Sequence, residues 1–348
     1  MRTTPRSVAL LLAAVLLSLL GPSVSAQATS DRLFLWKVRS NDNHVYLLGS
    51  IHVGNESFYP MPAEIEKAFA DCKVLAVEVD LTKVDQAAMQ ETLLARGVYE
   101  GNDTLANHVP DQTLKNVRAY FADKGLPPEA MEKFKPWALS VTITMLEMQA
   151  LGYKSELGID KHFMERANGK RVIELESADE QVKLLSGFPD KLEAEFLAST
   201  LESVDQAEGL MQGTVASWKT GDAATLERLL ITGPLGNRPA LKEVFEKLFD
   251  ERNEKMARKI EAFIKSKEPH FVVVGAGHLV GKNGILKLLE KQGFYVEQVA
   301  RGAAAARPAE VAAADARPSD AKAADSKAAE GEKKPVKRGY APADAWKK

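Results

Sequence analysis

The amino-acid sequence predicts an α/β domain: a mixed central β-sheet with two pseudo-repeated strand–Gly-x-x-His units, helices packed around it and a large helical insertion. Two observations predict this class. First, short and fully apolar runs alternate with longer segments whose apolar residues recur at the helical period. Second, two of the apolar runs, residues 45–48 and 271–274, are each followed at once by Gly-x-x-His. The order of elements along the chain supports this fold.

The N-terminal segment, Met1 to Ala26, has the three-part layout of a secretory signal peptide. Arg2 and Arg6 begin it, an apolar run follows, and Val24-Ser25-Ala26 offers a cleavage site. We expect cleavage there and a periplasmic or secreted protein. An uncleaved anchor is the alternative, although the apolar run is short for a membrane span. No later stretch of the sequence approaches a spanning length.

The C-terminal segment, residues 301–348, contains 17 alanines, 11 Lys/Arg and 7 Asp/Glu among its 48 residues. We expect a disordered tail, because such a segment offers little apolar surface to bury. Residues 27–300 then form the folded domain. A net charge of −2 does not imply a nucleic-acid partner, and the single cysteine excludes an intramolecular disulfide. The sequence does not predict the oligomeric state.

The sheet is expected to begin with a hairpin. Residues 33–38 and 44–48 have the composition of strands, and Asn41-Asp42-Asn43 between them is a turn signal. After the prolines at 60 and 62, a helix is predicted over residues 63–71. The apolar run at residues 74–77 is typical of a strand that is buried on both faces.

The middle of the chain is predicted to be mostly helical, and three further strands are expected. Residues 171–176 are predicted to form another core strand, and Ser177 with Glu180 has the spacing of a capping box at the start of the next helix. The remaining strands are expected at residues 271–274 and 294–299. Helices are expected at residues 85–96, 113–124, 136–151, 158–167, 191–229, 239–265 and 285–292.

The two strand–Gly-x-x-His segments suggest one functional site, with His52 and His278 at its centre. Sites in open α/β sheets collect beyond the carboxyl ends of strands, and glycine there lets the backbone approach a ligand closely. Two imidazoles and a carboxylate suit a divalent cation, and Mn, Co, Zn and Fe are all compatible. We therefore predict His52, His278 and Glu78 as metal ligands, and Glu176 or Asp80, which also follow strands, as the general base.

Each of these residues also has a structural interpretation. A histidine at a strand end is usually a hydrogen-bonded structural residue. Glu78 alone is compatible with a salt bridge, Asp80 with a helix cap and Glu176 with helix entry. The geometry of the folded chain has to distinguish these alternatives.

Several strings in the sequence resemble the TraB/GumN family, which is similar to the Tiki metalloproteases. The resemblance runs in consistent order through the strings at residues 47–54, 58–60, 75–80, 158–160, 174–177, 180–181, 252–253 and 275–281. It implies a site that uses both histidines and Glu78, with Arg252 and Asn253 nearby as groups that contact substrate or support the ligands. Glu174 departs from the glycine expected at that position.

These observations give three functional hypotheses. The first is an exported metal-dependent hydrolase acting on peptide bonds, in which the cation polarises a carbonyl and activates water, Glu176 or Asp80 accepts a proton, and Arg252 stabilises the oxyanion. The second is a metal-independent, esterase-like hydrolase with His52 as general base. The third is a non-catalytic periplasmic protein that binds a peptide or haem.

Overall fold

The computed structural model describes residues 31–40 and 42–302. The predicted signal peptide lies outside the described residues, and so does the predicted tail, apart from Arg301 and Gly302. The sheet has six strands in the order β4-β3-β5-β2-β1-β6. Their bounds are β1 Arg32–Arg39, β2 His44–Ser50, β3 Val74–Val77, β4 Arg171–Glu174, β5 His270–Gly275 and β6 Tyr295–Ala300.

The sheet is mixed, as predicted. β4, β3, β5 and β2 are parallel to one another, whereas β1 pairs antiparallel with β2 and with β6. The predicted N-terminal hairpin is therefore confirmed. The strand predicted at residues 171–176 is present as β4, but its placement in the core was wrong: β4 lies at the sheet edge and ends at Glu174, with every residue at least partly exposed. β5 is buried throughout because strands flank it on both sides.

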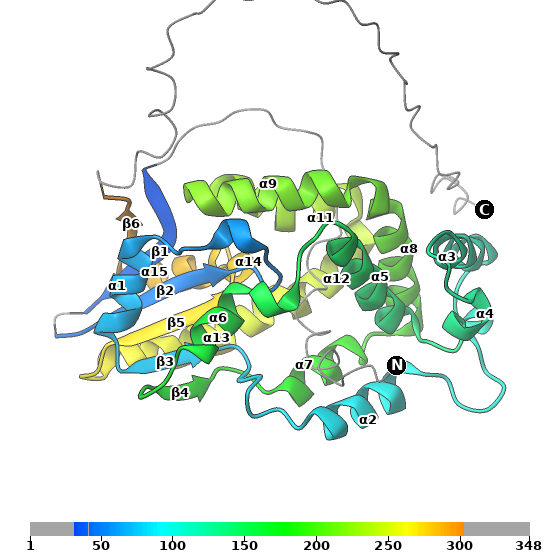
Figure 1. The fold of residues 1–348 in the computed structure, drawn as a ribbon, viewed down its shortest axis with the longest axis horizontal. Coiled ribbons are helices and arrows are strands. Elements are labelled where there is room, and N and C mark those ends of the chain that lie inside the picture. The colour runs from blue at the N-terminus through cyan, green and yellow to red at the C-terminus, as the bar shows by residue number, and fades with distance from the viewer. Residues whose placement is uncertain (1–30, 41, 303–348) are drawn as a thin grey trace, which may run out of the picture. The chain divides into compact units, whose positions relative to one another are not determined.

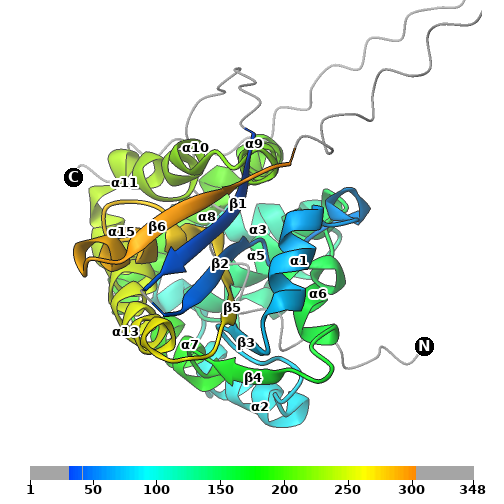
Figure 2. The ribbon, with the colours of Figure 1, turned by 90° about the vertical axis from the view of Figure 1, so that its left-hand side faces the viewer.

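Helices cover both faces of the sheet (Figure 2). α1 (Ala63–Asp71) and α6 (Ile159–Glu165) lie on one face, and α13 (Glu251–Lys265) and α15 (Ile285–Lys291) lie on the other. α1 has the bounds predicted from the sequence. Its buried residues join those of the sheet in the main apolar core, so α1 covers this face of the sheet.

The helical insertion gathers beyond one end of the strands (Figure 1). Its helices contribute to two further apolar clusters, one of which also includes residues 241–249. Its helices are α2 Gln86–Gly97, α3 Asp111–Asp123, α4 Pro128–Met131, α5 Pro136–Ala150, α7 Ala178–Leu185 and α8 Asp190–Ser203. Short 3-10 turns occur at Glu56–Phe58, Leu105–Asn107, Ser155–Leu157, Val204–Gln206 and Pro239–Leu241.

The two longest predicted helices are interrupted. Residues 191–229 divide among α8, α9 (Ala207–Thr220) and α10 (Ala223–Glu227). The 3-10 turn at Val204–Gln206 separates α8 from α9, and α9 ends at Gly221, which adopts a left-handed conformation with φ 69°. Two π-helical segments follow, η8 (Arg228–Thr232) and η10 (Glu246–Asp250). The short helices α11 (Gly233–Asn237) and α12 (Lys242–Phe245) lie between them, and α14 (Ala276–Leu279) follows β5.

Within the described residues, no helix is both long and apolar enough to cross a membrane.

Candidate active site

The strand ends bring the two predicted histidines and Glu78 together. β2, β5 and β3 are parallel, and their register places Ser50 beside Gly275 and Val77 beside Val273. The segments that follow these strands therefore emerge at the same edge of the sheet. A Cβ atom on Gly275 would lie 3.1 Å from His52 Nε2, 3.2 Å from Glu78 Oε1 and 3.5 Å from His278 Cδ2. All three predicted ligands thus surround one point, which is open because residue 275 is glycine.

His278 lies beside this point and has an unprotonated nitrogen near Glu78. Its Nδ1 lies 2.7 Å from Asn253 Oδ1, and the Asn253 amide donates to the carbonyl of Asn283 at 2.9 Å, which fixes the amide orientation. Burial, followed by the charge of Arg252, lowers the pKa of His278 to about 3, so the ring is neutral and its proton resides on Nδ1. The Nε2 lone pair is buried and has no hydrogen-bond partner among the described residues. It lies 3.8 Å from Glu78 Oε1.

His52 is oriented by a carboxylate. Its Nδ1 lies 2.8 Å from Asp160 Oδ1, which leaves Nε2 to face the centre. Burial lowers the pKa of His52, but Asp160 and Glu78 outweigh it and raise the pKa to about 9. In the absence of a cation the ring is therefore an imidazolium at neutral pH. Asp160 was not among the site residues predicted from the sequence, in which its signal was the Gly158-Ile159-Asp160 string of the family resemblance.

A close backbone approach places Asp160 beside His52. The amide of Ile159 donates to the carbonyl of Ile51 at 3.1 Å, and Gly54 exchanges backbone hydrogen bonds with Lys154. A Cβ atom on Gly158 would lie only 2.3 Å from the carbonyl oxygen of His52. Only glycine allows the two segments to pack at this distance.

Gly158→Ala is therefore expected to destabilise the protein by about 1–3 kcal/mol, because backbone has to move away from the new methyl group. Gly209→Ala in α9 is the matched control, since a Cβ atom there meets nothing within 4 Å. That change is expected to be neutral or to stabilise by about 0.5–1 kcal/mol. Urea unfolding of both variants tests the prediction, and equal midpoints for the two would contradict it.

Glu78 belongs to a buried ion network with Arg252 and Glu176. Nη2 of Arg252 donates to Glu78 at 2.8 Å and to Glu176 at 2.6 Å, and Nε donates to both oxygens of Glu176. The other oxygen of Glu78 accepts from the Gly275 amide at 2.5 Å. Burial raises the pKa of Glu78, but His278, Arg252, His52 and the Gly275 amide lower it to about 2. Glu78 is thus held as an anion beside both histidines.

Gln181 connects the two glutamates of this network. Its Nε2 lies 3.4 Å from Glu78 and 3.3 Å from Glu176. The predicted capping box of Ser177 and Glu180 is present at the start of α7, and it fixes the turn from which Gln181 projects. As with Asp160, only the family resemblance pointed to Gln181.

Asp80, the other candidate base, faces a local turn. Its carboxylate accepts from the backbone and hydroxyl of Thr82 and pairs with Lys83 at 2.8 Å. The Asp80 amide in turn donates to Glu174 at 2.8 Å. Glu174, which departs from the family pattern, thus supports this turn rather than the histidines. Glu176 is thus connected to the predicted centre through Arg252 and Gln181, whereas Asp80 lies in the turn.

The donor atoms at the centre suit a divalent cation. Each histidine presents Nε2 to the centre and engages Nδ1 with an oxygen acceptor, which is the usual arrangement of metal-binding imidazoles. His278 Nε2 and Glu78 Oε1 are 3.8 Å apart, which is less than the summed length of two metal–ligand bonds of about 2.1 Å each. One cation could therefore contact both atoms. Among the described residues, however, no three His, Cys, Asp or Glu side chains are arranged as a metal-binding group. In this arrangement Arg252 and the Gly275 amide engage Glu78.

The raised pKa of His52 predicts a pH dependence of stability in metal-free protein. A group whose pKa rises from 6.5 to about 9 on folding stabilises the protein fully below pH 6.5, and this contribution is lost as the pH rises towards 9. The loss is on the order of 3 kcal/mol. In Asp160→Asn the loss should be much smaller, since the carboxylate that raises the pKa is gone. Urea unfolding in chelator across this pH range measures it, and equal losses in both proteins would refute the prediction.

The fold and the site together define an α/β protein with a buried histidine–carboxylate centre at the carboxyl edge of its parallel strands. Comparison of sequences identifies the family: the profile of the TraB/PrgY/gumN family matches residues 34–298, and the chain belongs to this family. This agrees with the resemblance found in the sequence.

Three relatives show what the chain is similar to. The uncharacterised protein YbaP of Escherichia coli (strain K12) is 27% identical over 259 residues, which cover 71% of this chain and 88% of YbaP. An uncharacterised protein of Treponema pallidum is 22% identical over 281 residues, which cover 75% of this chain and 81% of that protein. Metalloprotease TIKI2 of Xenopus tropicalis is 23% identical over 330 residues, covering 77% of this chain and 60% of TIKI2. No solved structure matches the chain significantly.

Proposed function

We propose that this chain is an exported, metal-dependent hydrolase that acts on peptide bonds, with His52, His278 and Glu78 as ligands of a divalent cation. The observation that carries the proposal is the buried, unpartnered Nε2 of neutral His278, which lies beside Glu78 and next to the open point at Gly275. A lone pair buried in this way is costly unless it binds something. The metalloprotease name of distant relatives supports the proposal.

Each side chain of the centre has a role in this proposal. Asp160 and Asn253 orient the two imidazoles through their Nδ1 atoms, and the glycine at 275 leaves room for the cation and substrate. When bound, a divalent cation at such a centre supplies Lewis acidity and makes water more acidic. His52 has to lose its proton before Nε2 can act as a ligand, so binding of a cation at neutral pH should release a proton.

Arg252 and Glu176 support the centre in this proposal. Within the described part of the chain, the Arg252 guanidinium donates to Glu78, Glu176 and the Leu248 carbonyl, so Arg252 acts by positioning Glu78 rather than by binding an oxyanion. Of the two candidate bases, geometry favours Glu176, since Arg252 and Gln181 join it to Glu78. Asp80 is held by Thr82 and Lys83.

Cleavage of a peptide library by purified protein, with and without chelator, tests this function. The proposal expects cleavage that chelator abolishes and that added Mn, Co, Zn or Fe restores. Cleavage that persists in chelator would remove the cation from the mechanism.

One observation favours a second candidate, a hydrolase that uses His52 without a cation. Asp160 holds His52 as a carboxylate holds the histidine of a catalytic triad. With its pKa at about 9, however, His52 carries a proton at neutral pH and is better suited to general-acid than to general-base chemistry. Equal activity in chelated and metal-loaded protein, lost in His52→Ala, would support this candidate over the first.

Gly275→Ala separates the function of the centre from the stability of the fold. Gly275 has φ −49°, which alanine adopts readily, so the variant should stay folded. Its methyl group would occupy the point next to His52 Nε2 and Glu78 Oε1, and divalent-cation binding should be lost. Equilibrium dialysis combined with thermal unfolding measures both effects. Unchanged cation binding by folded Gly275→Ala would contradict the placement of the centre.

A further inference from the structure

A cavity lies next to two residues that contact His278, Phe249 and Asn253. Its volume is about 430 Å³, within the range of small-molecule sites. Phe249 lines the cavity and packs its ring 5.4 Å from that of His278, and Asn253 lines the cavity and binds His278 Nδ1. The cavity is thus adjacent to the centre. Apart from Phe249 and Asn253, no residue that lines the cavity has been assigned to the centre.

Both π-helical segments of the described residues line this cavity. η8 contributes Ile231 and Thr232, and η10 contributes Glu246, Phe249 and Asp250. π-helical turns account for well under 1% of residues and occur frequently at functional sites, because their backbone is less favourable than an α-helix. Two such segments that meet at one cavity indicate that its shape is functional.

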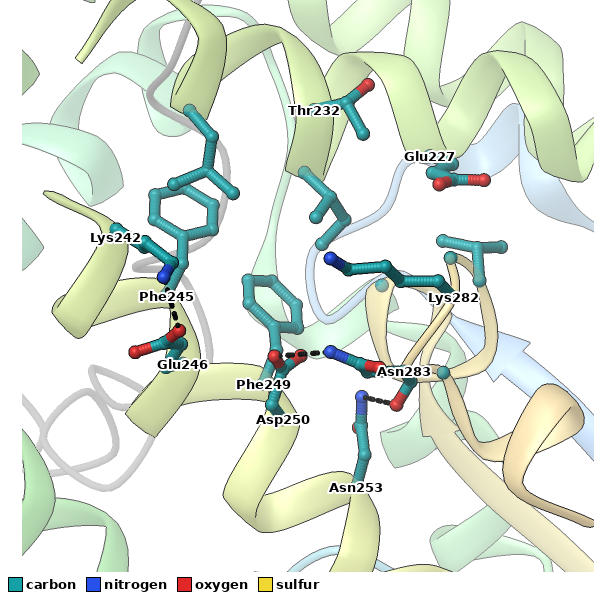
Figure 3. A pocket seen from close by; sticks show the side chains of 16 residues that line it. Glu227, Thr232, Lys242, Phe245, Glu246, Phe249, Asp250, Asn253, Lys282 and Asn283 are labelled. Atoms are coloured by element: carbon teal, nitrogen blue, oxygen red, sulfur yellow. Dashed lines mark hydrogen bonds and ion pairs between the residues drawn. The ribbon is translucent and has the colours of Figure 1, made fainter. Parts of the chain in front are cut away.

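The cavity combines an apolar wall with two unpaired charges of opposite sign. Phe245 and Phe249 form part of the apolar wall. Lys242 pairs with Glu246 at 3.3 Å, and Asp250 accepts from Asn283 at 2.7 Å (Figure 3). Lys282 and Glu227, in contrast, form no salt bridge within the described residues. Figure 3 shows the Lys282 side chain pointing into the cavity and Glu227 on another side of it.

We propose that this cavity binds a short zwitterionic peptide with apolar side chains. Lys282 would bind the terminal carboxylate and Glu227 the terminal ammonium, while the apolar side chains pack on Phe245 and Phe249. A simple anion fits less well, because the three carboxylates that line the cavity outnumber its two lysines. Binding at this site does not depend on whether the centre hydrolyses anything.

Three matched probes test the proposal by calorimetric titration of the full chain in chelator: the dipeptide Leu-Phe, its N-acetyl derivative and its C-terminal amide. Leu-Phe should bind saturably, and each blocked derivative should bind at least about tenfold more weakly, since each loses one charged hydrogen-bond partner. Lys282→Met should weaken the binding of Leu-Phe by at least about tenfold without changing the affinity for the C-terminal amide. Glu227→Gln should likewise weaken the binding of Leu-Phe without changing the affinity for the N-acetyl derivative.

Two further variants complete the test. Lys287→Met, at an exposed lysine outside the cavity, should bind all three probes like the wild type. Thr232→Trp adds a ring at an exposed lining position and should abolish binding of all three. Thermal unfolding confirms that each variant is folded. The proposal is overturned if the wild type shows no saturable binding of Leu-Phe, if folded Thr232→Trp binds normally, or if Lys282→Met and Lys287→Met behave alike.

Discussion

Replacing Arg252 with methionine is expected to lower the free energy of unfolding by about 3–5 kcal/mol. Arg252 is only 8% exposed, and its guanidinium joins the buried carboxylates of Glu78 and Glu176. Methionine fills much of the same space but leaves two buried anions without their counter-ion. The cost comes mainly from these uncompensated charges rather than from lost packing. Urea unfolding at neutral pH measures it.

Arg258→Met is the matched control, since it changes an exposed arginine on the same helix, α13. Arg258 pairs with Glu254 at 3.9 Å, and both side chains are mostly exposed, so a change of about 0–1 kcal/mol is expected. Adding Glu176→Gln to Arg252→Met should recover part of the lost stability, because one of the unpaired charges is then removed. The account of the network would be wrong if Arg252→Met and Arg258→Met destabilised the protein equally.

The second large effect is expected at His278. His278→Ala removes a buried imidazole whose lone pair lies beside Glu78 without a partner among the described residues, and it should weaken divalent-cation binding by more than about 100-fold. Asn253→Ala should have a smaller effect, about 10–100-fold, because it removes only the acceptor that fixes the ring orientation of His278. Competitive titration with Co²⁺ measures both affinities.

His44→Ala is the control for this series. His44 begins β2, the strand that leads to His52, and it pairs with Arg39 of β1 at the far end from the centre. Its replacement should leave cation binding unchanged. If His278→Ala bound cations as tightly as His44→Ala, His278 would not be a ligand.

The features that could be predicted from the sequence depend on local patterns. Apolar runs identified β3 and β5, and proline with helical spacing identified α1, because burial on both faces and helix initiation leave their signature in neighbouring residues. The convergence of His52 and His278 could be predicted for a related reason. Glycine after a buried strand marks the sheet edge at which parallel strands end.

The features that could not be predicted depend on contacts between distant segments. Asp160 lies beside His52 only because Gly158 packs against the carbonyl of residue 52, and the spacing of residues along the chain does not reveal this approach. The engagement of Arg252 by two glutamates is likewise a tertiary contact. The interruptions of the predicted helix at 239–265 arise from the π-helical η10, which has no clear sequence signal.

The measurement that tests the central claim most directly is elemental analysis of the full protein, purified without tag or chelator, beside Gly275→Ala prepared in the same way. The wild type should retain about one divalent cation per chain, as three side-chain ligands and one open position imply. Gly275→Ala should be folded and retain almost none, since its methyl group lies where His52 and Glu78 meet. A wild type that takes up no cation, or a folded variant that retains as much as the wild type, would contradict the account.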